Sequence, residues 1–150
     1  MSATPAVSVN HLTKVFKGHL GKGAFRAVHD VSFTVEAGEV YGLIGPNGSG
    51  KSTTMKAILG LLNATEGDTS IFGIPSTEVA SRRSVGFLPE NPYFYKHLTA
   101  RETMHFYGKL CGLTKSDLQQ RTTELLKLVK LDHAADRAVA GYSKGMLQRI

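Results

Sequence analysis

The stretch Gly45-Pro46-Asn47-Gly48-Ser49-Gly50-Lys51-Ser52 decides the fold, because it fits the pattern G-x-x-x-x-G-K-[S/T]. It follows a predicted strand at Glu39–Ile44, in which the nearly continuous apolar character of Val40–Ile44 is that of a strand covered on both faces. A helix is predicted to run from about Gly50 to Leu62. A glycine-rich loop between a buried strand and a helix gathers backbone amides at the positive end of the helix, and this arrangement binds phosphate.

Each residue type in this loop has a physical role. Glycine lets the backbone adopt conformations closed to other residues and lets its amides approach phosphate oxygens closely. Lys51 offers a mobile positive charge to the β- and γ-phosphates, and the Ser52 hydroxyl is a suitable Mg²⁺ ligand. The motif therefore predicts binding of a nucleoside triphosphate with Mg²⁺, against the alternative of a chance glycine-rich turn. The predicted contacts are Gly45, Pro46, Asn47, Gly48, Ser49, Gly50, Lys51, Ser52 and Thr53.

Length and composition set the class of protein. The 150 residues amount to about one domain, and 41% of them are hydrophobic, which is enough to build a core. A single cysteine, Cys111, excludes an intramolecular disulfide and favours the reducing cytosol. No apolar run reaches the roughly 18 residues needed to cross a bilayer, so we expect any membrane role of this sequence to be peripheral.

The positive charge is uneven along the chain, whose formal net charge is +6. Residues 1–29 carry Lys14, Lys17, Lys22 and Arg26 but no acidic residue. Such a basic arm suits a polyanion, although an ordinary solvated surface has the same composition. Charge alone therefore leaves the partner open.

The remaining pattern predicts strands before the phosphate loop and mainly helices after it. Val31, Phe33 and Val35 alternate as in a half-buried strand. The full set of predicted strands is Ala6–Val9, Arg26–Val28, Val31–Val35, Glu39–Ile44, a segment near Asp68–Phe72, and Val85–Leu88; a surface loop is predicted at 17–23 and a short helix at Thr77–Arg83. Several strands before the loop, and no D-x-x-G after Lys51, argue against a small GTPase.

Two helices have clear predicted boundaries. Thr99-Ala100-Arg101-Glu102 is a capping box, which starts a helix at about Ala100, and this helix ends at Cys111-Gly112. A second helix is capped by Thr114. The run Leu125–Asp132 looks like a strand that ends in a metal-binding Asp, the Walker B form. However, it belongs to this capped helix and contains two lysines, so the helical interpretation is preferred.

Three further segments resemble the ordered elements of an ATP-binding cassette (ABC) ATPase, and the resemblance extends from about Val7 to Ile150. They are Leu12–Phe16, Val85–Asn91 and Gly141–Arg149. The last is similar to the signature motif, in a Tyr-Ser-Lys-Gly-Met form associated with exporters. The resemblance implies an α/β P-loop NTPase with an N-terminal antiparallel β-subdomain, a RecA-like core and an α-helical subdomain. It places residues 1–88 in the first two parts and residues 89–150 in the helical part.

The resemblance also implies roles for individual residues. Phe16 matches the aromatic residue that stacks on adenine, with Phe25 as a rival in the same stretch. Glu90 stands where the family usually has Gln, which keeps an oxygen for Mg²⁺ but adds a charge. Ser143, Lys144 and Gly145 would contact the γ-phosphate held by a second ABC domain, in a head-to-tail dimer. Lys144 replaces the usual first Gly of the signature and Met146 replaces its Gln; the second change has no explanation from sequence.

These features imply the ATP-binding subunit of an ABC transporter on the cytoplasmic face of the cell membrane, with export favoured. The resemblance implies a transmembrane permease as the partner, and it implies that the neighbourhood of the loop Pro92–Tyr95 meets this permease. Two alternatives stay open. One is a soluble ABC ATPase that acts on ribosomes or nucleic acid, of which nucleic acid is the less favoured partner. The other is a regulatory module that binds ATP without hydrolysing it. The family's Walker B and switch His are expected beyond Ile150, so this sequence is read as the N-terminal part of a larger ATPase domain.

Overall fold

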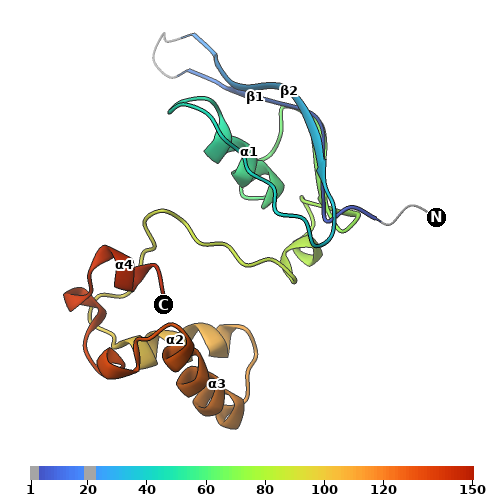
Figure 1. Cartoon of the computed structure of the whole chain (residues 1–150). Helices are drawn as coiled ribbons and strands as arrows, with labels where there is room; N and C mark the ends of the chain where they lie inside the picture. The colour runs from blue at the N-terminus through green and yellow to red at the C-terminus, as the bar shows by residue number, and fades with distance from the viewer. Residues whose placement is uncertain (1–3, 19–22) are drawn as a thin grey trace. The chain divides into compact units, whose positions relative to one another are not determined.

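The computed structural model describes residues 4–18 and 23–150, which form two compact units (Figure 1). The first unit extends to Gly86 and the second comprises Phe87–Ile150. Residues 19–22, the centre of the predicted surface loop, lie outside the described residues. Each unit has its own hydrophobic core and is described separately below.

The first unit is built on a four-stranded sheet with the order β2-β1-β3-β4, in which every neighbouring pair is antiparallel. This confirms the predicted antiparallel β-subdomain. The segments predicted as separate strands at 26–28 and 31–35 form one long strand, and the first strand is longer than predicted. The strands are β1 (Val7–Phe16), β2 (Phe25–Val35), β3 (Glu66–Ile71) and β4 (Ile74–Pro75).

An irregularity in the β1–β2 pairing sets which residues of β1 face the core. Val9 and Leu12 are both buried although they are three positions apart, whereas residues on one face of a regular strand are two positions apart. The register shifts between them, and His11 adopts φ 48°. A bulge of this kind inserts one extra residue, and it thereby returns Leu12 to the face of Val9.

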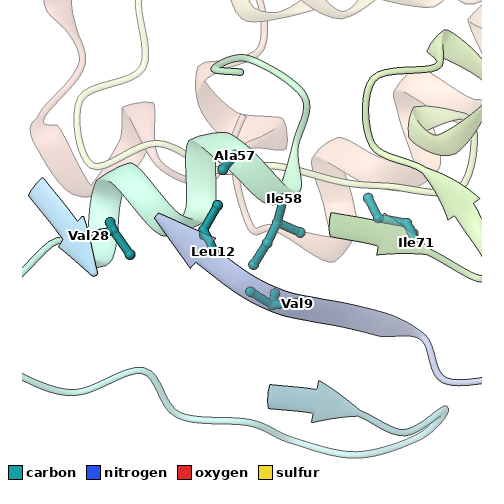
Figure 2. Packing of buried hydrophobic residues seen from close by; sticks show 6 residues of the cluster. All are labelled: Val9, Leu12, Val28, Ala57, Ile58 and Ile71. Atoms are coloured by element: carbon teal, nitrogen blue, oxygen red, sulfur yellow. The ribbon is translucent and has the colours of Figure 1, made fainter. Parts of the chain in front are cut away.

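Helix α1 (Lys51–Ile58) packs on that face of the sheet. Figure 2 shows Ala57 and Ile58 of α1 with the apolar side chains from the strands. The buried residues of this core are Val9, Leu12, Val28, Ala57, Ile58 and Ile71. The sheet thus supports α1, and α1 fixes the position of the phosphate loop that precedes it.

Helix α1 ends four residues before the predicted Leu62. Gly60 adopts φ 63°, its amide donates to the Ala57 carbonyl oxygen, and the Leu61 amide donates to the Lys56 carbonyl oxygen. These two bonds form a Schellman cap, which closes a helix and turns the chain away. A Cβ at Gly60 would collide with the Ser76 carbonyl oxygen, so glycine is required there.

Two predicted strands are wrong. Residues 39–44 and 85–88 form no strand, and Val40 and Ile44 are 98% and 94% exposed, not buried. A strand exists only where a neighbour completes its hydrogen-bond ladder, and none of the described strands pairs with either segment. The short helix predicted at 77–83 is a 3₁₀ turn, η1 (Val79–Arg82).

The second unit is helical, and its caps follow the sequence. The capping box at Thr99 is present: the Glu102 amide donates to Thr99 Oγ1 at 3.1 Å, and the Thr99 amide donates to Glu102 Oε2 at 2.8 Å. Thr114 accepts from the Asp117 amide at 3.3 Å. Of the run Leu125–Asp132, which was interpreted as a helix tail rather than Walker B, residues 125–128 form the end of α3 and Asp132 begins a 3₁₀ turn, so the run forms no strand. The elements are α2 (Ala100–Leu110), α3 (Lys115–Leu128), η2 (Asp132–Ala134), η3 (Val139–Gly141) and α4 (Lys144–Leu147).

The core of the second unit joins α2 and α3 to the segment that leads into α4. Tyr142 is buried, and its hydroxyl donates to the Ala134 carbonyl oxygen at 2.6 Å. Burial raises the pKa of the Tyr142 hydroxyl. The buried residues are Ala100, Leu126, Leu131, Ala134, Ala135 and Tyr142. Within residues 4–18 and 23–150, the helices are all too short or too polar to cross a membrane.

Candidate functional site

The phosphate loop has the backbone that its sequence predicts. Gly48 and Gly50 adopt φ 84° and 91°, in the left-handed region that glycine favours. Gly50 is the N-cap of α1, and the first turn of α1 contains no acidic side chain. The first amides of a helix have no partner inside the helix, so they form a positive end that suits an anion.

The two glycines differ in the space around them. A Cβ at Gly50 would lie 2.5 Å from the Ala27 carbonyl oxygen and 3.1 Å from Val28 Cγ2, both in β2. A Cβ at Gly48 would have no neighbour within 4 Å. Gly50 therefore lets the start of α1 lie against β2, whereas Gly48 leaves open space over the loop.

Lys51 lies over its own loop. Its Nζ donates to the carbonyl oxygens of Gly45 and Pro46, each at 2.7 Å, and lies 3.5 Å from Ser49 Oγ. The Lys51 ammonium group is thus held at the loop by uncharged oxygen acceptors. A phosphate group would offer a charged acceptor instead, and hydrogen bonds to charged groups are the stronger ones.

A pocket of about 490 Å³ lies beside this loop. Gly45 and Lys51 line it on the side of the phosphate loop, and β2 contributes Arg26, Ala27 and His29. Arg26 Nη1 lies 3.3 Å from His29 Nδ1. The pocket thus combines the backbone of the loop with cationic side chains, so an anionic ligand fits it. Arg26 and His29 were not predicted as site residues, and only their place in the basic arm hinted at them.

Ser52 and Thr53 occupy the first turn of α1 after Lys51. Ser52 is exposed and Thr53 is half-buried, while Thr54 is buried in the helix. The Ser52 hydroxyl is therefore accessible, and a hydroxyl oxygen is a ligand type that Mg²⁺ accepts. Pro46, Asn47 and the loop glycines up to Gly48 are exposed as well.

Phe16 lies at the end of β1, directly opposite Phe25 in the register. Phe16 is 40% exposed and Phe25 is 61% exposed, so neither ring is a core residue. Lys14 Nζ lies 5.3 Å from the centroid of the Phe16 ring and donates to the Asn63 carbonyl oxygen at 2.7 Å. The ammonium group fixes one face of the Phe16 ring through a cation–π contact.

Glu90 and the signature segment lie together in the second unit. Lys144 Nζ is 3.5 Å from Glu90 Oε1, and Gln148 Nε2 donates to the Glu90 carbonyl oxygen at 3.1 Å. Ser143 caps α4 by accepting from the Met146 amide at 3.3 Å, as predicted. Gln148, which contacts the Glu90 backbone, was not among the predicted site residues. Its position one helical turn after Lys144 was the available signal.

An ion pair joins the start of α2 to the turn that follows η2. Arg101 Nε lies 2.7 Å from Asp136 Oδ1, and the Arg101 amide donates to the Ala135 carbonyl oxygen at 3.0 Å. The hydrogen bond from Arg101 lowers the pKa of the Asp136 carboxyl and raises the pKa of Arg101. At the start of α2, the backbone hydrogen bond from Thr99 lowers the pKa of Glu102.

The predicted site residues are divided between the two units. Phe16 and residues 45–53 belong to the first, and Glu90 and residues 143–145 belong to the second. Within each unit the predicted residues cluster: the phosphate loop with its own pocket, and Glu90 with Lys144. The glycine-rich loop, Lys51 and the pocket beside them therefore all belong to the first unit.

Several known proteins are similar to this chain in sequence and in fold. YxlF, an uncharacterized ABC transporter ATP-binding protein of Bacillus subtilis, is 40% identical over 144 residues, which cover 96% of this chain and 46% of YxlF. The SkfA peptide export ATP-binding protein SkfE of the same bacterium is 33% identical over 144 residues, covering 96% of this chain and 58% of SkfE. The dimeric ATP-binding cassette MJ0796, solved in a post-hydrolysis state with ADP and Pi, matches with a TM-score of 0.83 at 27% identity, covering 95% of this chain and 66% of that chain.

The chain spans about half the length of the curated relatives it matches, 46% of YxlF and 58% of SkfE. The family described as ABC transporter matches residues 28–150, from the middle of β2 to the end of the signature segment. This match includes the phosphate loop and the helical unit that follows it. The chain therefore belongs to the ABC transporter family.

Proposed function

We propose that this chain is the nucleotide-binding part of an ABC transporter ATP-binding subunit, which couples ATP binding and hydrolysis to export across a membrane. The observation that carries the proposal is the phosphate loop, with two left-handed glycines and Lys51 held over it. Export is supported by the likeness to SkfE, a peptide export ATP-binding protein. The exported substrate would be selected by the membrane partner.

Lys51 would bind ATP by exchanging its acceptors. In the structure its ammonium group bonds to the Gly45 and Pro46 carbonyl oxygens. The β- and γ-phosphates would replace them as charged acceptors, while the amides at the start of α1 bind the same phosphates. Phe16 would stack on adenine with the ring face that Lys14 leaves free.

The exposed Ser52 hydroxyl and the Glu90 carboxylate are the oxygen ligands proposed for Mg²⁺, which neutralises charge on the phosphates when it is bound. Glu90 is 82% exposed at its side chain and lies beside Lys144, so it is accessible but already has a cationic neighbour. Residues 1–150 contain no counterpart of the family's Walker B Asp-Glu pair. We expect these residues alone to bind ATP without hydrolysing it.

The signature segment would act on the nucleotide of a second ABC domain in a head-to-tail dimer. Ser143, Lys144 and Gly145 are all exposed, so their surface is free to meet a partner. The likeness to MJ0796, which was solved as a dimer, supports such an assembly. Lys144 adds a cation to a surface that would face phosphate, which favours the contact electrostatically.

A transmembrane permease would bind an aromatic surface of the second unit, with this chain at the cytoplasmic face of the membrane as part of the proposal. Tyr93 is 93% exposed and Tyr95 is 54% exposed. Phe94 packs edge-on against Tyr107, with ring centroids 6.2 Å apart, and lines a pocket of about 340 Å³ between α2 and α3. Exposed aromatic rings beside an apolar pocket are typical of a protein interface.

The substitution Lys51→Ala tests nucleotide binding. Titration calorimetry with ATP and Mg²⁺ should show an affinity about 10- to 100-fold lower, because a hydrogen bond to a charged group is lost. Lys56→Ala is the matched control, since Lys56 is an exposed lysine on the same helix and does not line the pocket. Equal affinities of Lys51→Ala and the unsubstituted protein, with unchanged circular dichroism, would overturn the assignment.

The substitution Tyr93→Ala tests the membrane partner. Tyr93 is nearly fully exposed, so its loss should leave the fold intact while it weakens recovery of the permease in a pull-down by about tenfold. Leu128→Ala is the control, because Leu128 is also an exposed apolar residue of this unit, at 76%. Copurification with ribosomes or nucleic acid, with permease recovery insensitive to Tyr93, would instead favour a soluble ABC ATPase.

A further inference from the structure

The loop around Glu90 is attached to the signature helix at two points. Lys144 Nζ lies 3.5 Å from the Glu90 carboxylate, and Gln148 Nε2 donates to the Glu90 backbone carbonyl at 3.1 Å. Lys144 and Gln148 are four positions apart, so they lie on the same side of α4. One contact therefore holds the side chain of Glu90, and the other holds its backbone.

The residues that flank the signature helix are themselves attached to other parts of the second unit. Arg149 Nη1 donates to the Val129 carbonyl oxygen at 3.0 Å, and Val129 is the C-cap of α3. Tyr142, just before α4, is buried and bonds to Ala134. A short helix held in this way can serve as an anchor for a loop that has no helix or strand of its own.

The contact joins two residues of opposite charge that are 54 positions apart in the sequence. Loss of either charge would leave the other charge without its partner in this contact. The pair is solvent-exposed, with side-chain exposures of 62% for Lys144 and 82% for Glu90, so the electrostatic contribution is small and sensitive to salt.

We propose that Lys144 and Gln148 are positioning residues for Glu90, and that Glu90 and Lys144 are a matched charge pair that couples this loop to the signature helix. The inference rests on the proposed function, in which the loop contacts Mg²⁺ and the signature contacts a second nucleotide. With this attachment, displacement of the signature segment is transmitted to Glu90 directly within the second unit. Glu90 acts as a ligand, and Lys144 and Gln148 determine where its carboxylate is held.

Chymotrypsin offers a direct test, because it cleaves after the exposed rings of Tyr93 and Tyr95, close to Glu90. Cleavage needs the loop to open, so its rate reports the opening equilibrium. In the nucleotide-free protein, Lys144→Met should raise the loop cleavage rate about two- to fivefold. Gln148→Leu should raise it about two- to tenfold. Cleavage after Phe25, which is 61% exposed in the other unit, is the internal reference in the same digest.

Matched controls and a rescue separate positioning from general loss of stability. Lys127→Met and Gln119→Leu change exposed residues of the same types on α3 and should leave the loop rate unchanged. The double exchange Glu90→Lys with Lys144→Glu restores an ion pair of reversed sign and should return the rate toward that of the unsubstituted protein. Raising the salt concentration should accelerate loop cleavage in the unsubstituted protein and have little effect on Lys144→Met.

Two results would overturn the proposal: a loop rate unaffected by both Lys144→Met and Gln148→Leu, or a charge exchange that is no better than the single changes. Because the digest contains no nucleotide, it tests the attachment of the loop and not the binding of ATP. A protein that fails to bind ATP in calorimetry but shows the rescue would refute the proposed function alone. If the protein binds ATP but Glu90→Lys and Lys144→Glu have additive effects on the loop cleavage rate, the coupling alone is refuted.

Discussion

The close approach of Gly50 to β2 gives a quantitative prediction for Gly50→Ala. Gly48 and Gly50 both have left-handed backbones, at φ 84° and 91°. An alanine pays about 1–2 kcal/mol for that conformation, and it recovers about 0.4–1 kcal/mol because the unfolded chain becomes less flexible. Backbone strain alone therefore predicts a loss of about 0.5–1 kcal/mol at either position.

Only Gly50 carries an additional steric cost. Its Cβ would lie 2.5 Å from the Ala27 carbonyl oxygen, and this atom belongs to the backbone of β2 and cannot rotate away. Overpacking of this kind costs typically about 1–3 kcal/mol. Gly50→Ala should thus lower the free energy of unfolding by about 1.5–4 kcal/mol, against about 0.5–1 kcal/mol for Gly48→Ala, whose Cβ has no neighbour within 4 Å.

Urea unfolding of the protein, followed by far-ultraviolet circular dichroism, measures this difference. Gly145→Ala is the reference, since Gly145 has neither a positive φ nor a neighbour within 4 Å of its Cβ. ATP titrations of the same variants should show the larger loss of affinity for Gly50→Ala, because relief of the contact moves the first amides of α1. If Gly50→Ala costs no more than Gly48→Ala, the packing of α1 against β2 does not require glycine and the reasoning is refuted.

Three further predictions concern the second unit. Lys130 adopts φ 57° in the Schellman cap of α3, so Lys130→Gly should raise the free energy of unfolding by about 1 kcal/mol in urea titrations, and a loss would contradict the strain. Thr99→Ala removes the cap of α2 and should cost about 1 kcal/mol in the same assay; no change would mean that the cap is dispensable. Because the hydrogen bond from Arg101 lowers the pKa of Asp136, the ion pair stabilises the fold at neutral pH, and this stabilisation is lost as the pH falls below about 4. Asp136→Asn should therefore make the urea midpoint of unfolding less dependent on pH below about 4. An unaltered pH profile would exclude the ion pair as a cause of that dependence.

The features that the sequence predicts well are those whose partners lie within about one helical turn. The caps at Thr99, Thr114 and Ser143 all accept from an amide three residues later, and all three are present. The end of α1 was misplaced. Gly60 was available in the sequence, but its role depends on a left-handed conformation and on the nearby Ser76, which a pattern of apolar residues does not reveal.

The site shows the same division between local and distant partners. The phosphate loop could be predicted because its motif is contiguous and each residue type has a defined role. The pocket beside it also needs Arg26 and His29 from β2, which are about twenty positions away from the loop and carry no motif of their own. Likewise, Glu90 and Lys144 could each be singled out by likeness to a family, whereas their contact is a property of the folded second unit.

The segment 39–44 shows why apolar character alone cannot define a strand. Its sequence is suited to burial on both faces, yet Val40 and Ile44 are almost fully exposed and only Tyr41 stacks, 4.9 Å from Phe33 between ring centroids. The energy that makes a strand comes from hydrogen bonds and side-chain contacts with its neighbours, and the four described strands lie elsewhere in the first unit. Residues 39–44 therefore present exposed apolar side chains directly before the phosphate loop. Any element that pairs with residues 39–44 would also restrain Gly45 and, through it, the carbonyl oxygen that holds Lys51.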